Sequence, residues 1–149
     1  MAQSLAAIYI HCVFRTKHGD PHIHPRIEEK LHAYIAGILK KLGSPAIKIN
    51  SMPDHIHLLF RNTKNRSLAE VIQLVKKDSS KWMKSKGFDS FRWQNGYGAF
   101  SVSQSKVEIV KKYIQNQKPY HHKKGFMEEV ELFMKEYEIE EYSKEYFWK

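Results

Sequence analysis

The stretch AIKINSMPDHIHLLFR, residues 46–61, contains two short hydrophobic runs on either side of a Pro-Asp pair. Proline and aspartate favour tight turns, so the stretch predicts a β-hairpin. Successive side chains of a strand point to opposite faces of a sheet. His55 and His57 are therefore expected to share one face, with Ile56 pointing into the core on the other.

Hydrophobic periodicity and turn residues predict further elements on both sides of this hairpin. Ser67, followed three residues later by Glu70, is a capping-box sequence that predicts a helix start. Pro119 is expected to end a later helix, because proline lacks the backbone N–H that a helix interior needs. The expected strands are residues 5–16, 46–52, 55–61 and 97–103, and the expected helices are residues 26–42, about 67–86, from Ser103 or Ser105 to about 117, and 126–137.

The order of these elements predicts the fold class. Strand, helix, strand, strand, helix, strand is the split β-α-β arrangement of ferredoxin-like α+β folds, with an antiparallel sheet and helices packed on one face. The other face is expected to be open to a ligand, and C-terminal helices are expected to carry a tyrosine discussed below. We expect a single domain over residues 1–149, with a core over residues 4–117 and a helical extension over residues 118–149.

Composition agrees with a folded globular protein that binds a polyanion. Of 149 residues, 42% are hydrophobic and 28% charged, which is ordinary for one globular domain. Lysine and arginine number 25 against 16 acidic residues, giving a net charge of +9, and such a basic chain suggests nucleic acid as a partner. The acidic residues concentrate from Glu128 onwards, so the preceding part of the chain is more basic still.

The cysteine content and the N-terminus favour a reducing compartment. A single cysteine, Cys12, excludes an internal disulfide framework and is expected in the core. The chain does not begin like a signal peptide, and no apolar run approaches the ~20 residues that span a bilayer. We therefore expect a cytoplasmic protein with no membrane partner, associated with the nucleoid when bound to DNA.

The two histidines of the hairpin are candidate metal ligands. From one face of a strand, the imidazoles of His55 and His57 can reach one ion, and imidazole is a common ligand of Mn, Zn, Fe and Ni. Spacing alone also fits a pair of surface histidines on an amphipathic strand. The same His-Ile-His spacing at residues 22–24 lies between two prolines, where a solvated loop is expected, and residues 121–122 are expected to be surface histidines.

A second candidate pair lies on the expected helix before Pro119. Residues four apart share a helix face, so Tyr113 and Gln117 are expected to project together. The Tyr113 hydroxyl could act as a nucleophile beside a metal ion, and the amide oxygen of Gln117 could serve as a third ligand. The alternative is a tyrosine packed in the core and a solvated glutamine.

Four motifs in order along the chain resemble one family. IHCVFRTK (residues 10–17), MPDHIHLL (52–59), WQNGYGAFSV (93–102) and YIQNQ (113–117) are similar to the single-tyrosine HUH transposases of IS200/IS605-type insertion sequences. In HUH, U is a bulky hydrophobic residue, here Ile56. The resemblance covers nearly the whole chain and includes the acidic C-terminal part.

The resemblance implies a mechanism and a set of functional residues. His55, His57 and Gln117 would bind one Mg²⁺ or Mn²⁺ ion, and Tyr113 would attack single-stranded DNA to give a 5′-phosphotyrosine and a free 3′-OH. A new 3′-OH could then displace the tyrosine and rejoin a strand without ATP. The family also implies a homodimer with active sites formed in trans, which binds hairpins at the ends of the element.

Single-stranded DNA is expected to lie across a basic, aromatic surface. Trp82 is as compatible with the core as with base stacking. The candidate DNA contacts are Arg15, Lys17, Arg61, Lys64, Arg66, Lys76, Lys77, Lys81, Lys84, Arg92 and Trp93.

Three other functions remain open at this point. A non-catalytic nucleic-acid-binding module would explain the charge and the fold, although not the joint presence of His55, His57, Tyr113 and Gln117. A metal-dependent hydrolase would use water and leave no covalent DNA adduct. A domesticated, repeat-associated HUH endonuclease would cleave repeats without mobilising its own gene.

Overall fold

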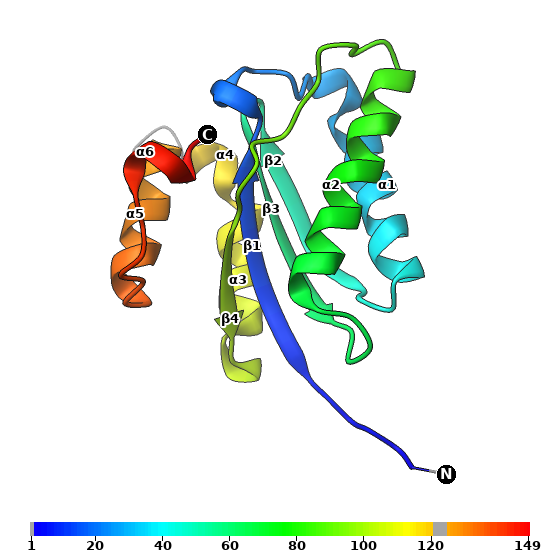
Figure 1. Ribbon diagram of the computed structural model, residues 1–149, viewed down its shortest axis with the longest axis vertical. Coiled ribbons are helices and arrows are strands. Elements are labelled where there is room, and N and C mark those ends of the chain that lie inside the picture. The colour runs from blue at the N-terminus through cyan, green and yellow to red at the C-terminus, as the bar shows by residue number, and fades with distance from the viewer. Residues whose placement is uncertain (1, 121–124) are drawn as a thin grey trace.

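The computed structural model describes residues 2–120 and 125–149 as an antiparallel sheet with helices on both faces (Figure 1). The four strands lie in the order β2-β3-β1-β4. None of the described helices is long and apolar enough to cross a membrane. The strands are β1 (Ile8–Arg15), β2 (Ala46–Met52), β3 (His55–Asn62) and β4 (Gly98–Val102), and the helices are α1 (Pro25–Lys41), α2 (Leu68–Ser85), α3 (Val107–Gln115), α4 (Gln117–Tyr120), α5 (Phe126–Glu136) and α6 (Lys144–Phe147).

This arrangement confirms the predicted ferredoxin-like α+β class. Helices α1 and α2 pack side by side on one face of the sheet, and the main core lies beneath them. The side chains of Cys12, Ile56 and Leu58 are fully buried in that core. As the hairpin pattern predicted, Ile56 faces the core, and the buried position of Cys12 agrees with its expected role.

The opposite face, which was expected to be open, is covered. Helix α3 packs on β2 and β3 and buries Ile114 against Leu59 and Val102. Helix α5 packs beside it, with Val130 in a cluster that includes Phe100 of β4. Both helices are amphipathic and have an apolar side to bury. The periodicity of α3 and α5 does not show which surface their apolar sides cover, so an open face was expected.

Strands β2 and β3 follow the predicted hairpin closely, whereas β1 and β4 are shorter than predicted. The register pairs Met52 with His55, so the Pro-Asp pair forms the tight turn that was predicted. Strand β1 begins at Ile8, opposite Asn62 at the end of β3, and has no partner before that point in the register. Leu5, expected within the first strand, is 81% exposed.

The predicted start of α2 is confirmed, with one difference. The Ser67 side chain accepts a hydrogen bond from the backbone N–H of Glu70 at 3.1 Å, as an N-cap does. The Glu70 carboxylate, which a full capping box would direct back to Ser67, instead accepts a hydrogen bond from Arg66 at 2.6 Å.

The predicted helix up to residue 117 is divided in two. Helix α3 ends at Gln115, and Asn116 has φ −95° and ψ 20° before α4 begins. Asn50 of β2 donates its side-chain amide to the carbonyl oxygen of Ile114 at 2.8 Å, which satisfies a carbonyl at the end of α3. Pro119 lies within α4 and does not end that helix. Backbone N–H groups in the first turn of a helix have no intrahelical acceptor, so the missing N–H of proline removes no hydrogen bond there.

Candidate active site

The site is built around the two histidines of β3. His55 and His57 project from the sheet face that α3 and α5 cover, both are buried, and their ring centroids lie 5.3 Å apart. Nδ1 of His55 lies 2.7 Å from a carboxylate oxygen of Asp54. Burial lowers the pKa of His55, and the hydrogen bond that His55 donates to Asp54 opposes that shift only in part. A neutral imidazole results, which is the form that binds metal ions.

A third histidine belongs to the same cluster. His11 of β1 is 3% exposed, and its Nε2 lies 3.0 Å from Nδ1 of His57. Burial lowers the pKa of His11 to about 4, so this imidazole is also neutral. Sequence reasoning placed His11 only within a strand motif. His11 lies an even number of residues from Val13 and Arg15, so the three share one face of β1. Val13 and Arg15 pair with His57 and His55, and this shared face is the signal that could have identified His11.

Tyr113 of α3 faces this cluster. Its ring centroid lies 5.9 Å from that of His57 and 6.1 Å from that of His11, both edge-on. The Tyr113 hydroxyl donates a hydrogen bond to the carboxyl group of Glu129 in α5. The tyrosine therefore lies beside the histidines of its own chain. Its hydroxyl is bonded to Glu129, which lies C-terminal to the four sequence motifs.

Gln117 also reaches the site, although it lies on a different helix from Tyr113. Its side chain is fully buried, donates to the backbone carbonyl of Tyr113 at 3.3 Å and is hydrogen-bonded to His55. The structure thus brings together all four residues that the sequence singled out as catalytic or metal-binding.

Helix α5 contributes residues that sequence reasoning missed. The Phe126 ring stacks on His55 with a centroid distance of 3.7 Å and an angle of 13°. Phe133 lies edge-on to His11 and Tyr113. Glu129 is 2% exposed, and burial raises its pKa to about 8. Their spacing of three, four and seven residues places them on one helix side, so the pattern identified a buried side without showing what it covers.

The donor set fits a divalent ion. Nδ1 of His55 contacts Asp54 and Nδ1 of His57 contacts His11, so Nε2 is the coordinating atom that each ring can offer. No group of three or more His, Cys, Asp or Glu residues in the described part of the chain is arranged to hold a metal. Gln117, whose side-chain amide is hydrogen-bonded to His55, is placed to supply a third ligand.

The second His-Ile-His copy lies on the loop before α1, as expected. Ile23 is buried, while His22 is half-buried and His24 is exposed. Their rings lie beside different aromatic residues, Phe91 and Phe88, respectively. The histidines at residues 121–122 lie outside the described residues.

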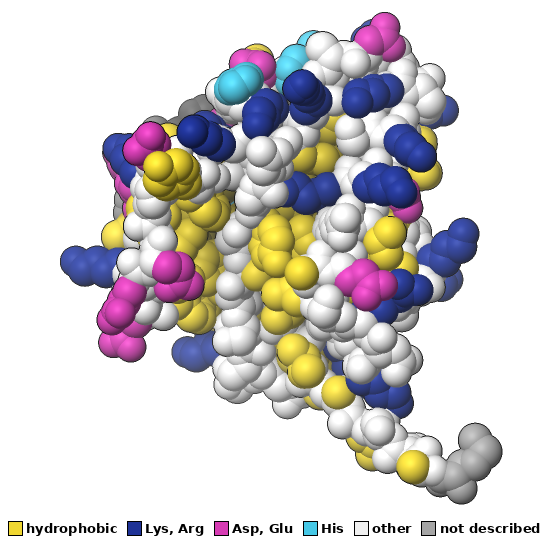
Figure 2. Space-filling model, viewed as in Figure 1, with side chains coloured by type: hydrophobic (Ala, Val, Ile, Leu, Met, Phe, Trp, Pro, Cys, Tyr) yellow, Lys and Arg dark blue, Asp and Glu magenta, His cyan; other side chains and the backbone are white. Residues whose placement is uncertain are grey.

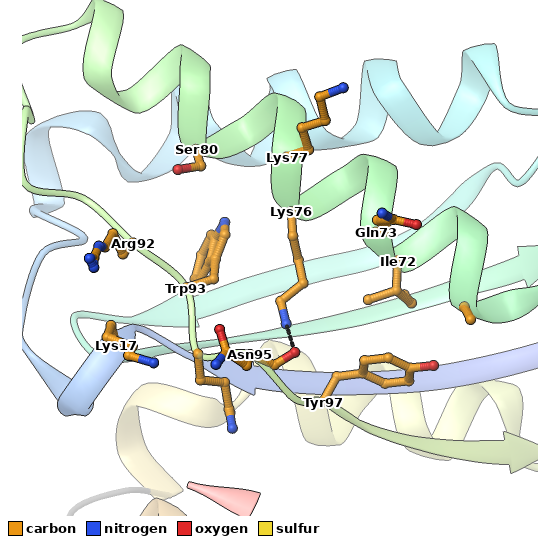
Figure 3. A pocket seen from close by; sticks show the side chains of 12 residues that line it. Lys17, Ile72, Gln73, Lys76, Lys77, Ser80, Arg92, Trp93, Asn95 and Tyr97 are labelled. Atoms are coloured by element: carbon orange, nitrogen blue, oxygen red, sulfur yellow. Dashed lines mark hydrogen bonds between the residues drawn. The ribbon is translucent and has the colours of Figure 1, made fainter. Parts of the chain in front are cut away.

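Five of the candidate DNA contacts, four cations and Trp93, line one pocket of about 410 Å³ between α2 and the segment that precedes β4 (Figure 3). No acidic residue is among the described residues that line it. Lys76 extends from α2 and donates to the backbone carbonyl of Asn95 at 3.2 Å, as Figure 3 shows, and to that of Gly96 at 2.8 Å. Burial lowers the pKa of Lys76 to about 8. Lysine and arginine side chains gather on this side of the molecule, and many of the acidic ones lie toward the C-terminal helices (Figure 2). The four cations are Lys17, Lys76, Lys77 and Arg92.

The other candidates are dispersed. Arg15 donates to the backbone carbonyl of Trp148 at 2.8 Å and lies over its ring, so the C-terminal residues cover it. Arg61 and Lys64 donate to backbone carbonyls of the N-terminal segment. Arg66 pairs with Glu70, and Lys81 and Lys84 are exposed on α2.

The two tryptophans considered for DNA contact contribute mainly to packing. Trp93 is 7% exposed, packs edge-on against Phe14 and Phe91, and donates its indole N–H to Ser79 at 3.0 Å. It lines the pocket but offers no face for stacking a base, contrary to its expected role as a DNA contact. Trp82 is half-buried and stacks on Tyr34.

A ferredoxin-like sheet with two histidines on an inner strand and a helical tyrosine beside them defines the class of single-tyrosine transposases. Residues 4–117 match the family described as "Transposase IS200 like". The chain belongs to the IS200-like transposase family, which confirms the resemblance to IS200/IS605-type enzymes.

Relatives of known sequence or structure agree with this assignment. The chain is 24% identical over 114 residues to the ISDra2 transposase TnpA of Deinococcus radiodurans, covering 72% of this chain and 81% of that protein. Its fold is similar to a candidate transposase of D. radiodurans R1, with a TM-score of 0.61, 20% identity and coverage of 78% of this chain and 98% of that one. It is also similar to a REP-associated tyrosine transposase bound to a REP hairpin, with a TM-score of 0.59, 12% identity and coverage of 81% and 74%.

Proposed function

We propose that this transposase cleaves and rejoins single strands of DNA through a covalent bond to Tyr113. The observation that carries the proposal is the convergence of Tyr113, His55, His57 and Gln117 in one buried site, from three separate elements. The alternative for this pair was a tyrosine packed in the core and a solvated glutamine. Gln117 is instead fully buried beside a histidine.

The proposed chemistry balances at the phosphate. The Tyr113 oxygen attacks phosphorus, the bond to the 3′ oxygen breaks, and the products are a 5′-phosphotyrosine and a free 3′-OH. The phenol must lose a proton, and Glu129, its hydrogen-bond partner, is placed to accept it. A carboxyl group whose pKa is about 8 is well matched to that role near neutral pH.

A Mg²⁺ or Mn²⁺ ion is the proposed cofactor, held by His55, His57 and Gln117. When bound, it would neutralise charge that develops on the phosphate oxygens. Both imidazoles are buried, burial lowers the pKa of His55, and α5 closes the site on the side away from the sheet. Substrate must enter past α5 or displace it.

The proposed substrate is single-stranded DNA that folds into a hairpin. The basic pocket beneath α2 supports a phosphate contact, because four cations line it and no described lining residue is acidic. The similarity to a transposase bound to a REP hairpin supports the hairpin form. The pocket lies on the α2 side of the sheet and the histidines lie on the opposite face, so DNA that reaches both must pass around the sheet.

A homodimer with exchanged tyrosine helices is also proposed, from the family resemblance. In a single chain α3 docks on its own β2 and β3. An exchanged helix from a second copy would make the same contacts, because the two chains are identical. The described structure contains one chain and supports either arrangement.

Incubation with the DNA that flanks its own gene tests this function. The two single strands would be supplied separately with Mn²⁺ or Mg²⁺, and the products separated under denaturing conditions. We expect cleavage together with protein-linked DNA. A metal-dependent hydrolase would give cleavage without linked DNA, and a binding module would give neither.

A further inference from the structure

His11 lies where a histidine needs a specific partner. It occupies the middle of β1, opposite Leu59, so His57 is its diagonal neighbour across the β1–β3 ladder. The two rings are nearly parallel, at 23°, with centroids 5.2 Å apart. Burying an imidazole is costly unless its polar atoms are hydrogen-bonded. The 3.0 Å contact between His11 Nε2 and His57 Nδ1 supplies such a bond.

The direction of this hydrogen bond decides what His57 can do. A neutral imidazole carries one hydrogen, on either Nδ1 or Nε2. If His57 donates from Nδ1, its Nε2 presents a lone pair. If His57 accepts at Nδ1, its hydrogen is on Nε2, and that atom cannot coordinate an ion.

We infer that His11 is a positioning residue, which accepts the Nδ1 hydrogen of His57 and thereby holds Nε2 of His57 ready for a divalent ion. The inference rests on the proposed role of His57 as a metal ligand. His11 does not itself contact DNA or the ion in this arrangement. Metal-binding histidines commonly donate their other N–H to a partner that fixes the ring and its tautomer.

The second histidine of the pair has a comparable arrangement. Nδ1 of His55 lies 2.7 Å from an oxygen of Asp54, and a carboxylate can only accept from it. Both proposed ligands are therefore engaged through Nδ1, one by a carboxylate and the other by an imidazole. Asp54 is adjacent to His55 in sequence, whereas His11 is brought to His57 by the pairing of β1 with β3.

Neighbouring rings hold His11 in this orientation. Phe133 of α5 lies edge-on to it at 5.5 Å and Tyr113 of α3 edge-on at 6.1 Å, and Phe100 of β4 lies at 6.3 Å, all between centroids. Three elements other than β1 and β3 thus enclose the His11 side chain. A substitution that keeps the volume of His11 but removes its acceptor isolates the hydrogen bond from this packing.

His11→Leu and His11→Gln provide that comparison, because leucine cannot accept a hydrogen bond and the glutamine amide oxygen can. The first measurement is the tautomer of His57 by ¹⁵N NMR in metal-free protein at neutral pH. We expect the Nδ1–H tautomer in wild type and in His11→Gln, and a shift toward Nε2–H in His11→Leu. The second is Mn²⁺ affinity by electron paramagnetic resonance, expected to fall about 10- to 100-fold in His11→Leu and to be largely retained in His11→Gln.

His32→Leu is the matched control, since His32 is a half-buried histidine bonded to a different partner, Ser51, at 2.7 Å. It should leave the His57 tautomer and Mn²⁺ affinity unchanged. An Nε2–H tautomer of His57 in wild type overturns the inference, even if the leucine variant fails to fold. So does a leucine variant that matches wild type in both measurements. Failure of wild type to bind Mn²⁺ counts against the proposed metal, while the tautomer still decides the role of His11.

Discussion

The hydroxyl of Tyr113 donates a hydrogen bond to the carboxyl group of Glu129, across the interface between α3 and α5. The proposed nucleophile is thereby tied to the helix that also stacks Phe126 on His55. The acidic C-terminal part of the chain, which differs in charge from the more basic part before Glu128, thus supplies a wall of the site.

The buried carboxyl group of Glu129 predicts a pH dependence of stability. Burial raises its pKa to about 8 in the folded state, whereas an unfolded glutamate has its ordinary value near 4.5. Between these values the folded protein binds more protons than the unfolded one, so stability is lost as pH rises from about 4.5 to about 8. The difference in thermal stability between metal-free wild type and Glu129→Gln should show this loss, because buried histidines such as His11, whose pKa is lowered, contribute an opposite slope in both proteins. If the stability of the two proteins depended on pH in the same way, the raised pKa of Glu129 would be contradicted.

The two His-Ile-His copies should respond differently to substitution. His55→Ala or His57→Ala should lower cleavage at least about 100-fold, because an ion that stabilises the transition state by several kcal/mol is lost. Hairpin affinity in the same variants should be retained, measured by fluorescence anisotropy. The control, His22→Ala with His24→Ala, removes the loop copy and should cleave normally. If the His22/His24 variant lost cleavage while the His55 and His57 variants retained it, the loop copy and not the β3 copy would be the metal-binding one.

The basic pocket predicts a local electrostatic contribution to DNA binding. Lys77 and Arg92 are exposed, so replacing both with alanine should leave the fold intact. Each lost phosphate contact should reduce the slope of log K against log salt by about 0.7 for single strands. The control is Lys30→Ala with Lys40→Ala, which removes the same charge from exposed positions of α1. If both pairs of substitutions reduce the slope equally, the pocket makes no specific contact with DNA phosphates.

The sequence predicted the sheet because its signals are local. The Pro-Asp turn and the alternation around Ile56 determine the hairpin, and with it the common face of His55 and His57. The break at Asn116 escaped prediction because it depends on a hydrogen bond between Asn50 and the end of α3, 64 residues apart in sequence. Glu129 escaped it for the same reason, and His11 escaped it because its place beside His57 depends on the pairing of β1 with β3.

Exchange of tyrosine helices between subunits can be tested by mixing two inactive proteins. Tyr113→Phe lacks the nucleophile and His57→Ala lacks a proposed ligand. If sites form in trans, a mixed dimer contains one intact site and should recover partial cleavage. In one chain Tyr113 lies beside its own His57, so without helix exchange a mixture of the two proteins should recover no cleavage. Cleavage by the mixture, measured after co-refolding, therefore supports exchange, and its absence supports self-contained sites.

The covalent bond to Tyr113 is the central claim, and mass spectrometry of the protein–DNA product tests it most directly. Wild type incubated with its single-stranded flanking DNA and Mn²⁺ would be digested and the modified peptide sequenced. The account predicts a nucleotide attached to Tyr113, and no adduct in Tyr113→Phe, which keeps the ring that packs beside His57. An adduct on another residue, or an undiminished adduct in the phenylalanine variant, would contradict it.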